Sequence, residues 1–257
     1  MKVITHSLYM TVRHLRSLAR QPLYIMFTLV QPIIWLVLFG QLFKKVVLLP
    51  GFRAPAYVDF LTPGVVIMTV LFGSGWSGMG VIRDLDQGVM DRFLISPASR
   101  VALIAGRLIQ LSVVAVIQSV LIIVLGLIMG ARFQGGILGV VALIACAVLL
   151  AVPIGALSCA MALVARKEET VIGAANFILL PLTFLSSVFM AANLAPAWIR
   201  GVARFNPVEW AVEAARTALS AQPDWGAVLS RVGLLAALAA LTGWVATRAF
   251  RAYQRSV

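Results

Sequence analysis

The sequence predicts an all-α integral membrane protein with six transmembrane helices. Five stretches of 23 residues or more carry no charged side chain, at residues 21–43, 60–82, 108–131, 133–165 and 170–199. About 20 apolar residues cross the roughly 30 Å of bilayer hydrocarbon as a helix, so each stretch is long enough. A soluble helix of this length would show a charged outer face, and none of these does. A shorter stretch, 232–247, predicts a sixth crossing that begins near Val228, with Arg231 reaching back to the surface.

Composition supports this class. The chain is 61% hydrophobic and 12% charged, which excludes a disordered or ordinary soluble protein. Its net charge of +12 could indicate nucleic-acid binding in a soluble protein, but here the basic residues lie mostly in short segments between apolar runs. There they set orientation in the membrane. Cys146 and Cys159 fall in one predicted helix, about 20 Å apart, and so cannot form a disulfide with each other.

Residues 1–20 predict an amphipathic interfacial helix. At 100° per residue its basic side chains share an arc of about 60°, and its apolar side chains fill an adjacent arc of about 120°. Such a helix lies flat in the headgroup layer, either as a lipid anchor alone or with an added partner contact. His6 and His14 lie here without an acidic or cysteine companion, so no metal site is predicted.

We predict spans at about residues 23–43, 61–81, 108–129, 137–163, 171–190 and 228–247. Pro32, Pro153 and Pro181 interrupt three of them and should kink those helices. Residues 73–78 match G-x-G-x-x-G, but they follow no strand and lie inside a membrane helix, so a dinucleotide site is excluded. Small residues at this spacing instead predict close helix packing.

Uncharged polar and small residues inside the spans are candidates for a substrate path or for a dimer interface. Interhelical hydrogen bonding is the alternative role for the amides. The candidates are Gln31, Gln118, Gly173 and Asn176.

Orientation follows from the basic residues. With the N-terminus inside, the cytoplasmic segments hold 13 of the 21 Lys and Arg residues. Six crossings place both termini on one side, and both termini are basic, so both are predicted to be cytoplasmic in a cell (inner) membrane.

Two polar segments stand out between the spans. The cytoplasmic segment 83–99 displays charged and apolar side chains that suit either a docked protein or a solvated loop. The outer segment 191–227 predicts two short helices, the first dipping into the outer leaflet around residues 194–205. The second begins with Asn206 as N-cap, Pro207 at N1 and Glu209 at N3.

These segments resemble a known family. Residues 84–100 resemble the acidic residue, Gly, then Arg-x-x-x-x-Pro-x-x-Arg pattern that precedes the third helix in permeases of the type-2 ABC exporter family. Residues 180–189 are similar to the fifth helix of that family's daunorubicin-resistance-type branch. Pro196–Ile199, Asn206-Pro207 and Ala215-Arg216 resemble the outer segment that follows.

The resemblance implies a dimeric permease, as a homodimer or with a close paralogue, bound to two cytoplasmic ATPase subunits. It also implies short re-entrant outer helices before the sixth span. Residues 83–99 would be the segment that docks in the ATPase. Its contact and shaping residues would be Asp84, Gly88, Asp91, Arg92 and Pro97, with Asp86 as the alternative to Asp84 for the key acid.

The residues themselves point to an external source of energy. The chain has no Gly-Lys dipeptide, hence no phosphate-binding P-loop, and it offers no catalytic set of residues, so ATP and Mg²⁺ would bind to the partner ATPase. An ion-coupled secondary transporter is the alternative, but the five long spans lack the acidic or histidine residues that bind its ions. A channel would need a charged ring or a filter motif. The expected cargo is a hydrophobic or amphipathic drug or lipid-like molecule, while related permeases also translocate lipids and polymers.

Overall fold

A computed structural model describes residues 30–48, 52, 54–87 and 100–253, and every regular element in these ranges is a helix. The first elements are the π-helix η1 (Trp35–Phe39), α3 (Gly40–Leu42) and the 3-10 helix η2 (Lys44–Leu48). The long helices are α4 (Tyr57–Gly75), α5 (Gly78–Asp86), α7 (Arg100–Ile128), α8 (Gly136–Ala165), α9 (Glu168–Phe184) and α12 (Trp225–Tyr253). Between α9 and α12 lie η3 (Ala192–Leu194), α10 (Ala197–Ala203) and α11 (Pro207–Leu219).

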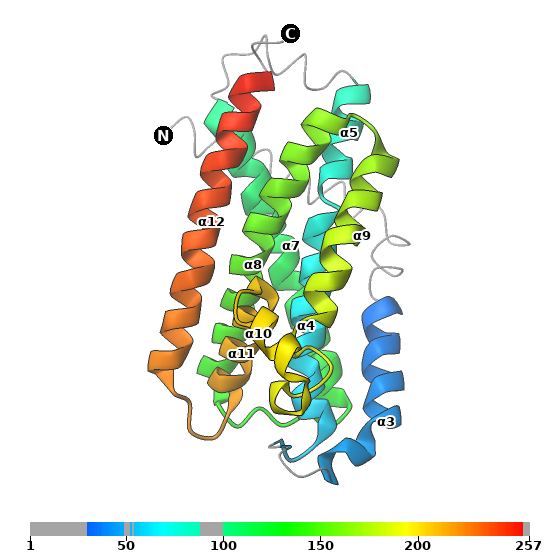
Figure 1. The fold of residues 1–257 in the computed structure, drawn as a ribbon, viewed down its shortest axis with the longest axis vertical. Coiled ribbons are helices and arrows are strands. Elements are labelled where there is room, and N and C mark those ends of the chain that lie inside the picture. Colours follow the sequence, from blue (N-terminus) through cyan, green and yellow to red (C-terminus); the bar gives the residue numbers. More distant parts are fainter. Residues whose placement is uncertain (1–29, 49–51, 53, 88–99, 254–257) are drawn as a thin grey trace.

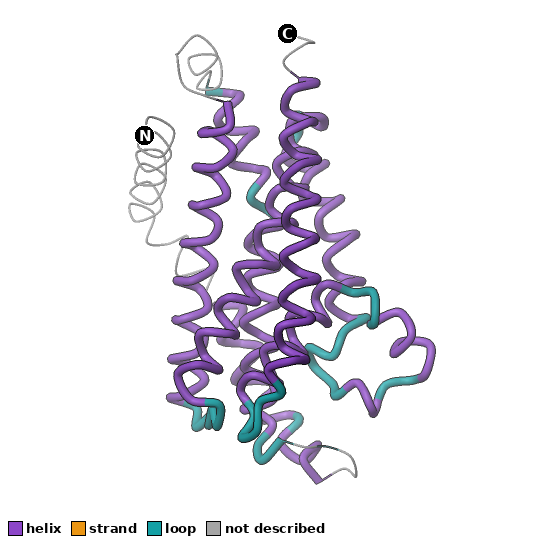
Figure 2. The backbone as a smooth tube through the Cα atoms, turned by 90° about the vertical axis from the view of Figure 1, so that its left-hand side faces the viewer, coloured by secondary structure: helices purple, strands orange, loops and turns teal. Residues whose placement is uncertain are grey.

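The long helices form a bundle with α8 at its centre, in contact with α4, α5, α7, α9, α11 and α12 (Figure 1). The end of α5 and the C-terminal end of α12 lie at one end of the bundle, at the top of Figure 1. The start of α4 and the connection from α7 to α8 lie at the other. Short segments between α9 and α11 leave the bundle on one side (Figure 2).

Four helical stretches in the described residues are long and apolar enough to cross a membrane: Tyr57–Asp86, Gly106–Ile128, Gly136–Ala165 and Trp225–Trp244. A shorter apolar helix covers Val30–Leu42, and α9 has 17 residues. Within the described residues the all-helical prediction is therefore confirmed, and these four helices agree with a membrane protein. The count of six spans remains a prediction, as does the interfacial helix at residues 1–20, which lies outside the described ranges.

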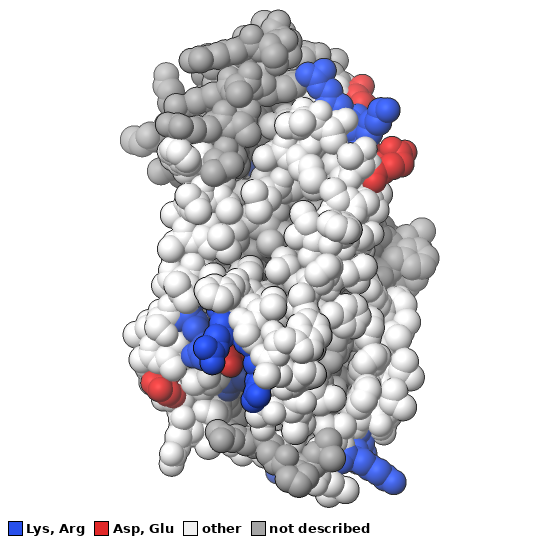
Figure 3. Space-filling view, viewed as in Figure 1, with Lys and Arg blue, Asp and Glu red and all other residues white. Residues whose placement is uncertain are grey.

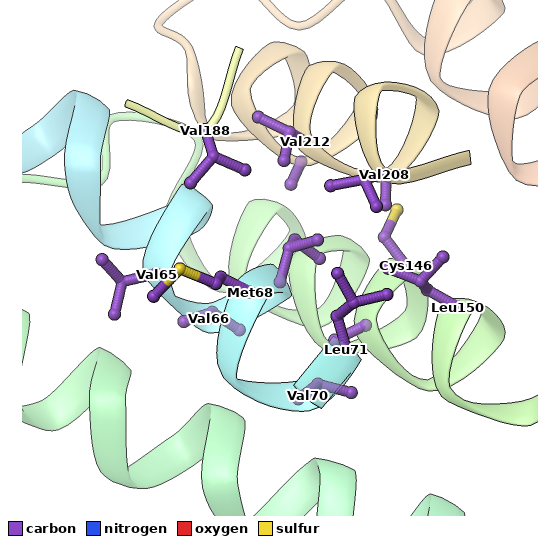
Figure 4. Close-up of a cluster of buried hydrophobic side chains, with 14 of the residues drawn as sticks. Val65, Val66, Met68, Val70, Leu71, Cys146, Leu150, Val188, Val208 and Val212 are labelled. Carbon is purple, nitrogen blue, oxygen red and sulfur yellow. The ribbon is translucent and has the colours of Figure 1, made fainter. Parts of the chain in front are cut away.

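Apolar side chains fill the core and also cover much of the surface. Val65, Val66, Met68, Val70 and Leu71 of α4 pack against α8 and α11 (Figure 4). Large exposed hydrophobics, such as Phe177 at 81% exposure, mark the outward faces. Charged side chains gather toward the two ends and over α10 and α11, and leave an uncharged belt between them (Figure 3). This pattern suits a bundle whose outer surface contacts lipid.

The structure departs from regular α-helix after Pro32 and after α9. The π-helix η1 begins three residues after Pro32, whereas α8 and α9 run through Pro153 and Pro181 as continuous α-helices. A π-helix is rare and occurs mostly as a single turn within a longer helix. The helix α9 ends at Phe184, before the predicted end of its span at residue 190. The next residues form turns whose carbonyl groups are bonded by side chains from elsewhere.

Candidate functional site

The predicted docking segment is described as far as Gln87. Asp84 and Asp86 lie in the last turn of α5, where Asp84 is half-buried and Asp86 is exposed. Gly88, Asp91, Arg92 and Pro97 lie outside the described residues. The structure therefore gives the helix that leads into this segment and the contacts that position that helix.

Charged contacts tie α5 to two neighbouring helices. Arg107 of α7 donates from Nη2 to the carbonyl of Ser77 at 2.8 Å, and its Nη1 lies 3.9 Å from Asp84 Oδ2. Arg83 donates from Nε to Glu168 of α9 at 3.2 Å, and both of these side chains are exposed. Exposed ion pairs contribute about 0.2–1 kcal/mol, so the Arg83–Glu168 pair orients α5 more than it stabilises the fold.

The second predicted span contains a hydrogen-bonded break. The helix α4 ends at Gly75 and α5 begins at Gly78. Ser158 of α8 bridges the gap: its Oγ donates to the carbonyl of Gly75 at 2.5 Å and accepts from the N–H of Gly78 at 3.0 Å. One hydroxyl thus replaces backbone bonds that the break removes, which is how irregular helices are tolerated in membranes.

Glycine makes this bridge possible. A Cβ at Gly78 would overlap the backbone and side chain of Ser158, and a Cβ at Gly75 would overlap Leu179 of α9. The prediction that the small residues at 73–78 permit close helix packing is confirmed. The sequence did not reveal the roles of Ser158 and Arg107. A serine in an apolar run and an arginine at the end of a span are common in membrane proteins, and the sequence does not show which distant residues they bind.

Replacing Ser158 with alanine is expected to weaken the α4–α5 junction. The carbonyl of Gly75 and the N–H of Gly78 would lose their shared partner, at a cost of about 1–2 kcal/mol. The measurement is thermal unfolding in nanodiscs. Ser119→Ala is the matched control, because buried Ser119 donates to Ala115 in its own helix and bridges no break. Equal melting temperatures for the two variants would contradict this role for Ser158.

The four candidates for a substrate path or dimer interface do not form one cluster. Gln118, at 9% exposure, packs between α7 and α4, with its amide against Gly73. Gly173 lies on an exposed face of α9, where a Cβ would meet nothing within 4 Å, and Asn176 is half-buried one turn further on. Gln31 is exposed in the helix at 30–42. Their role as a path or interface stays a prediction, and the surroundings of Gln118 match the interhelical alternative.

At the opposite end of the bundle, α11 holds the end of α9. Asn206 caps α11 by accepting from the N–H of Val208 at 2.9 Å, with Pro207 in the first turn, so the predicted cap is confirmed. The same side chain donates from Nδ2 to the carbonyls of Leu182 and Leu185 at 2.7 and 2.9 Å. One residue thus begins α11 and ends α9.

Arg216 also holds the end of α9. We call Asn206, Glu209 and Arg216 together the α11 clamp. Its guanidinium donates to the carbonyl of Phe60 at 3.2 Å and to that of Val188 at 3.0 Å. It also donates to the carbonyl and hydroxyl of Ser187 at 2.8 and 3.0 Å, and its Cζ stands 3.4 Å above the centre of the Phe60 ring. Four hydrogen bonds from one side chain therefore join α11, α4 and the turn after α9.

Glu209 completes the clamp from the same helix. Its carboxylate, on a residue 4% exposed, accepts from the N–H of Ser187 at 2.5 Å. Burial raises the pKa of Glu209 and lowers that of Arg216 to about 9, so Arg216 remains protonated at neutral pH. The hydroxyl of Tyr57 donates to the carbonyl of Phe189 at 2.9 Å. Asn206, Arg216 and Tyr57 thus pair the carbonyl groups exposed where α9 stops, and Glu209 pairs the N–H of Ser187.

Comparison with known proteins supports one family. The profile of the ABC-2 type transporters matches residues 5–219. The daunorubicin resistance ABC transporter permease protein DrrB1 of Streptomyces coeruleorubidus is 29% identical over 86% of this chain and 78% of its own length. A putative transport permease, ycf38, of Cyanophora paradoxa is 28% identical over 78% of this chain and 69% of its own. The probable doxorubicin resistance ABC transporter permease protein DrrC of Mycobacterium tuberculosis is 21% identical over 83% of this chain and 76% of its own.

Proposed function

Because this chain belongs to the ABC-2 type transporter family, we propose that it is the transmembrane permease subunit of an ATP-driven exporter. The observation that carries the proposal is a family match over residues 5–219 on a bundle of long apolar helices. The family match favours this function over the ion-coupled secondary transporter considered from the sequence.

The proposed cargo is a hydrophobic or amphipathic drug or lipid-like molecule. Two relatives carry names for daunorubicin or doxorubicin resistance. The uncharged belt on the face shown in Figure 3 would suit a cargo that enters from the bilayer. A lipid or polymer cargo is the alternative within the same family.

The energy would come from a separate chain. We assign ATP and Mg²⁺ to two cytoplasmic ATPase subunits, which would dock at residues 83–99. The contacts of Arg83 and Arg107 would then join the docking segment to α7 and α9. A change in the position of the docked ATPase would reach the bundle through α5 and its junction with α4.

The assembly would be a dimer of permease chains in the cell (inner) membrane, each with six spans, re-entrant outer helices and cytoplasmic termini. The first and fifth spans are the proposed interface. Gly173 on the open face of α9 and the apolar residues exposed beside it, such as Phe177, suit close packing of a second copy.

The function is tested by transport in inverted membrane vesicles that hold the chain with its ATPase partner. We expect ATP-dependent uptake of daunorubicin, and no uptake when the P-loop lysine of the ATPase is replaced. Uptake that needs an ion gradient and persists with this ATPase variant would contradict the proposal.

A further inference from the structure

A cavity of about 510 Å³ lies beside the α11 clamp, at the end of the bundle where α4 begins. Its walls come from the first turns of α4, the connection between α7 and α8, the segment around η3, and α11. This volume falls in the range of cavities that hold drug-sized ligands. In the proposed orientation this is the outer, release side of the membrane.

Apolar and aromatic side chains form much of the lining. Phe52, Phe133 and Leu219 line the cavity, and the ring of Phe52 lies 5.1 Å from that of Phe60 at an angle of 57°. A face of the Phe60 ring is covered by Arg216. Phe52 and Phe133 therefore remain as aromatic surfaces for the flat part of a ligand.

Two carboxylates line the cavity, and among the described residues only Asp59 is free of an ion pair. Glu213 pairs with Arg231 of α12 through Oε2 at 2.6 Å, which offsets its charge. Asp59 accepts from the backbone N–H of Arg132 through Oδ1 at 2.7 Å, and its Oδ2 takes no hydrogen bond from the described residues. Asp59 Oδ2 is thus available to a cationic group of a ligand.

Among the described residues, neither arginine in the lining forms an ion pair with Asp59. Arg216 donates four of its five N–H groups to Phe60, Ser187 and Val188, and the neighbouring Glu209 opposes its positive charge. Arg132 is exposed at the rim, where water and salt screen its charge. The ligand chemistry that fits is an aromatic ring system with one positive charge.

We infer that this cavity is a release-side binding site for cationic aromatic amphiphiles, with Asp59 as the group that selects the positive charge. The inference rests on the proposed function and names its substrate class. A cargo held here would lie between the phenylalanines and Asp59 before it leaves to water. A neutral analogue of the cargo would make the apolar contacts in this cavity but not the ionic one.

The test is daunorubicin binding, by its fluorescence, to the permease–ATPase complex in nanodiscs. Asp59→Asn keeps the acceptor for Arg132 and removes the charge, so we expect about tenfold weaker binding of the cation. N-acetylated daunorubicin, which lacks the charge, should bind wild type weakly and be unaffected by this change. Asp224→Asn is the matched control, since exposed Asp224 also accepts one backbone N–H, from Ala227 at 3.1 Å, and lies outside the cavity.

A second variant tests the cavity without relying on charge. Ala192→Trp places a large ring in the lining and should weaken binding of both probes. Equal affinity of wild type and Asp59→Asn for daunorubicin, or an equal loss for both probes, would overturn the inference. If ATP-dependent transport persists in that case, the proposed function still stands; a complex that binds the drug but never transports it with ATP contradicts the function instead.

Discussion

Replacing Arg216 with leucine is expected to destabilise the protein by about 3–5 kcal/mol, because the carbonyls of Phe60, Ser187 and Val188 would lose their donors together. The side chain also covers the face of Phe60, so the variant would lose packing at the same corner. The end of α9 would then be held by Asn206 and Glu209 alone among the residues of α11.

Thermal unfolding in nanodiscs and the yield of folded protein measure this effect. Arg216→Lys keeps the positive charge but loses the planar guanidinium, so its melting temperature should lie between those of Arg216→Leu and wild type. Arg200→Leu is the matched control, because Arg200 is an exposed arginine on the neighbouring helix α10. A melting temperature for Arg216→Leu equal to that of the control would show that the clamp carries no stability.

The membrane class and the positions of the long helices could be predicted because each depends on a local property of the chain. A long run without charges favours a helix in hydrocarbon, because a helix pairs its own backbone groups. The N-cap at Asn206 was predictable for the same reason, since its partner Val208 is two residues away. The ends of α8 follow from where the charged residues resume, whereas α12 continues past the predicted end of its span at residue 247 to Tyr253.

The direction in which a polar stripe faces could not be predicted. Glu209, Glu213 and Arg216 recur at helical spacing, and such a stripe can face either water or unpaired backbone groups. Here Glu209 and Arg216 face the end of α9, more than 20 residues earlier in the chain. The N–H group that Glu209 binds and the carbonyls that Arg216 binds there are free because α9 stops at Phe184. The apolar sequence at 180–189 gives no sign of this stop beyond Pro181.

The break in the second span was hidden for a related reason. Glycine and serine at 73–78 are compatible with a continuous helix packed closely on its neighbours. The break becomes stable because Ser158 lies at the same depth in α8, about 80 residues later. Whether Ser158 lies level with the break depends on how α8 packs beside α4 in the folded chain. The local sequence around either segment therefore cannot predict this contact.

The largest functional effect is expected from the docking segment that follows this break. Replacing Asp91 and Arg92 together with alanine should abolish transport and the substrate-stimulated ATP hydrolysis of the partner. Neither residue lies in a predicted span, so membrane insertion and dimer formation should be unchanged. A contact can convert nucleotide binding into movement of the spans only if its free energy differs between the open and closed ATPase.

The measurements are drug uptake in vesicles, ATP hydrolysis with and without drug, and the amount of ATPase that co-purifies. Lys44→Ala with Lys45→Ala is the matched control: it also removes two charges, at the far end of the bundle from α5, and should transport normally. Loss of transport with the ATPase still bound would place the defect in coupling rather than in assembly. Full transport by the Asp91 and Arg92 double variant would show that segment 83–99 is a solvated loop with no role in coupling. In that case the contacts of Arg83 and Arg107 would serve only to hold α5 in place.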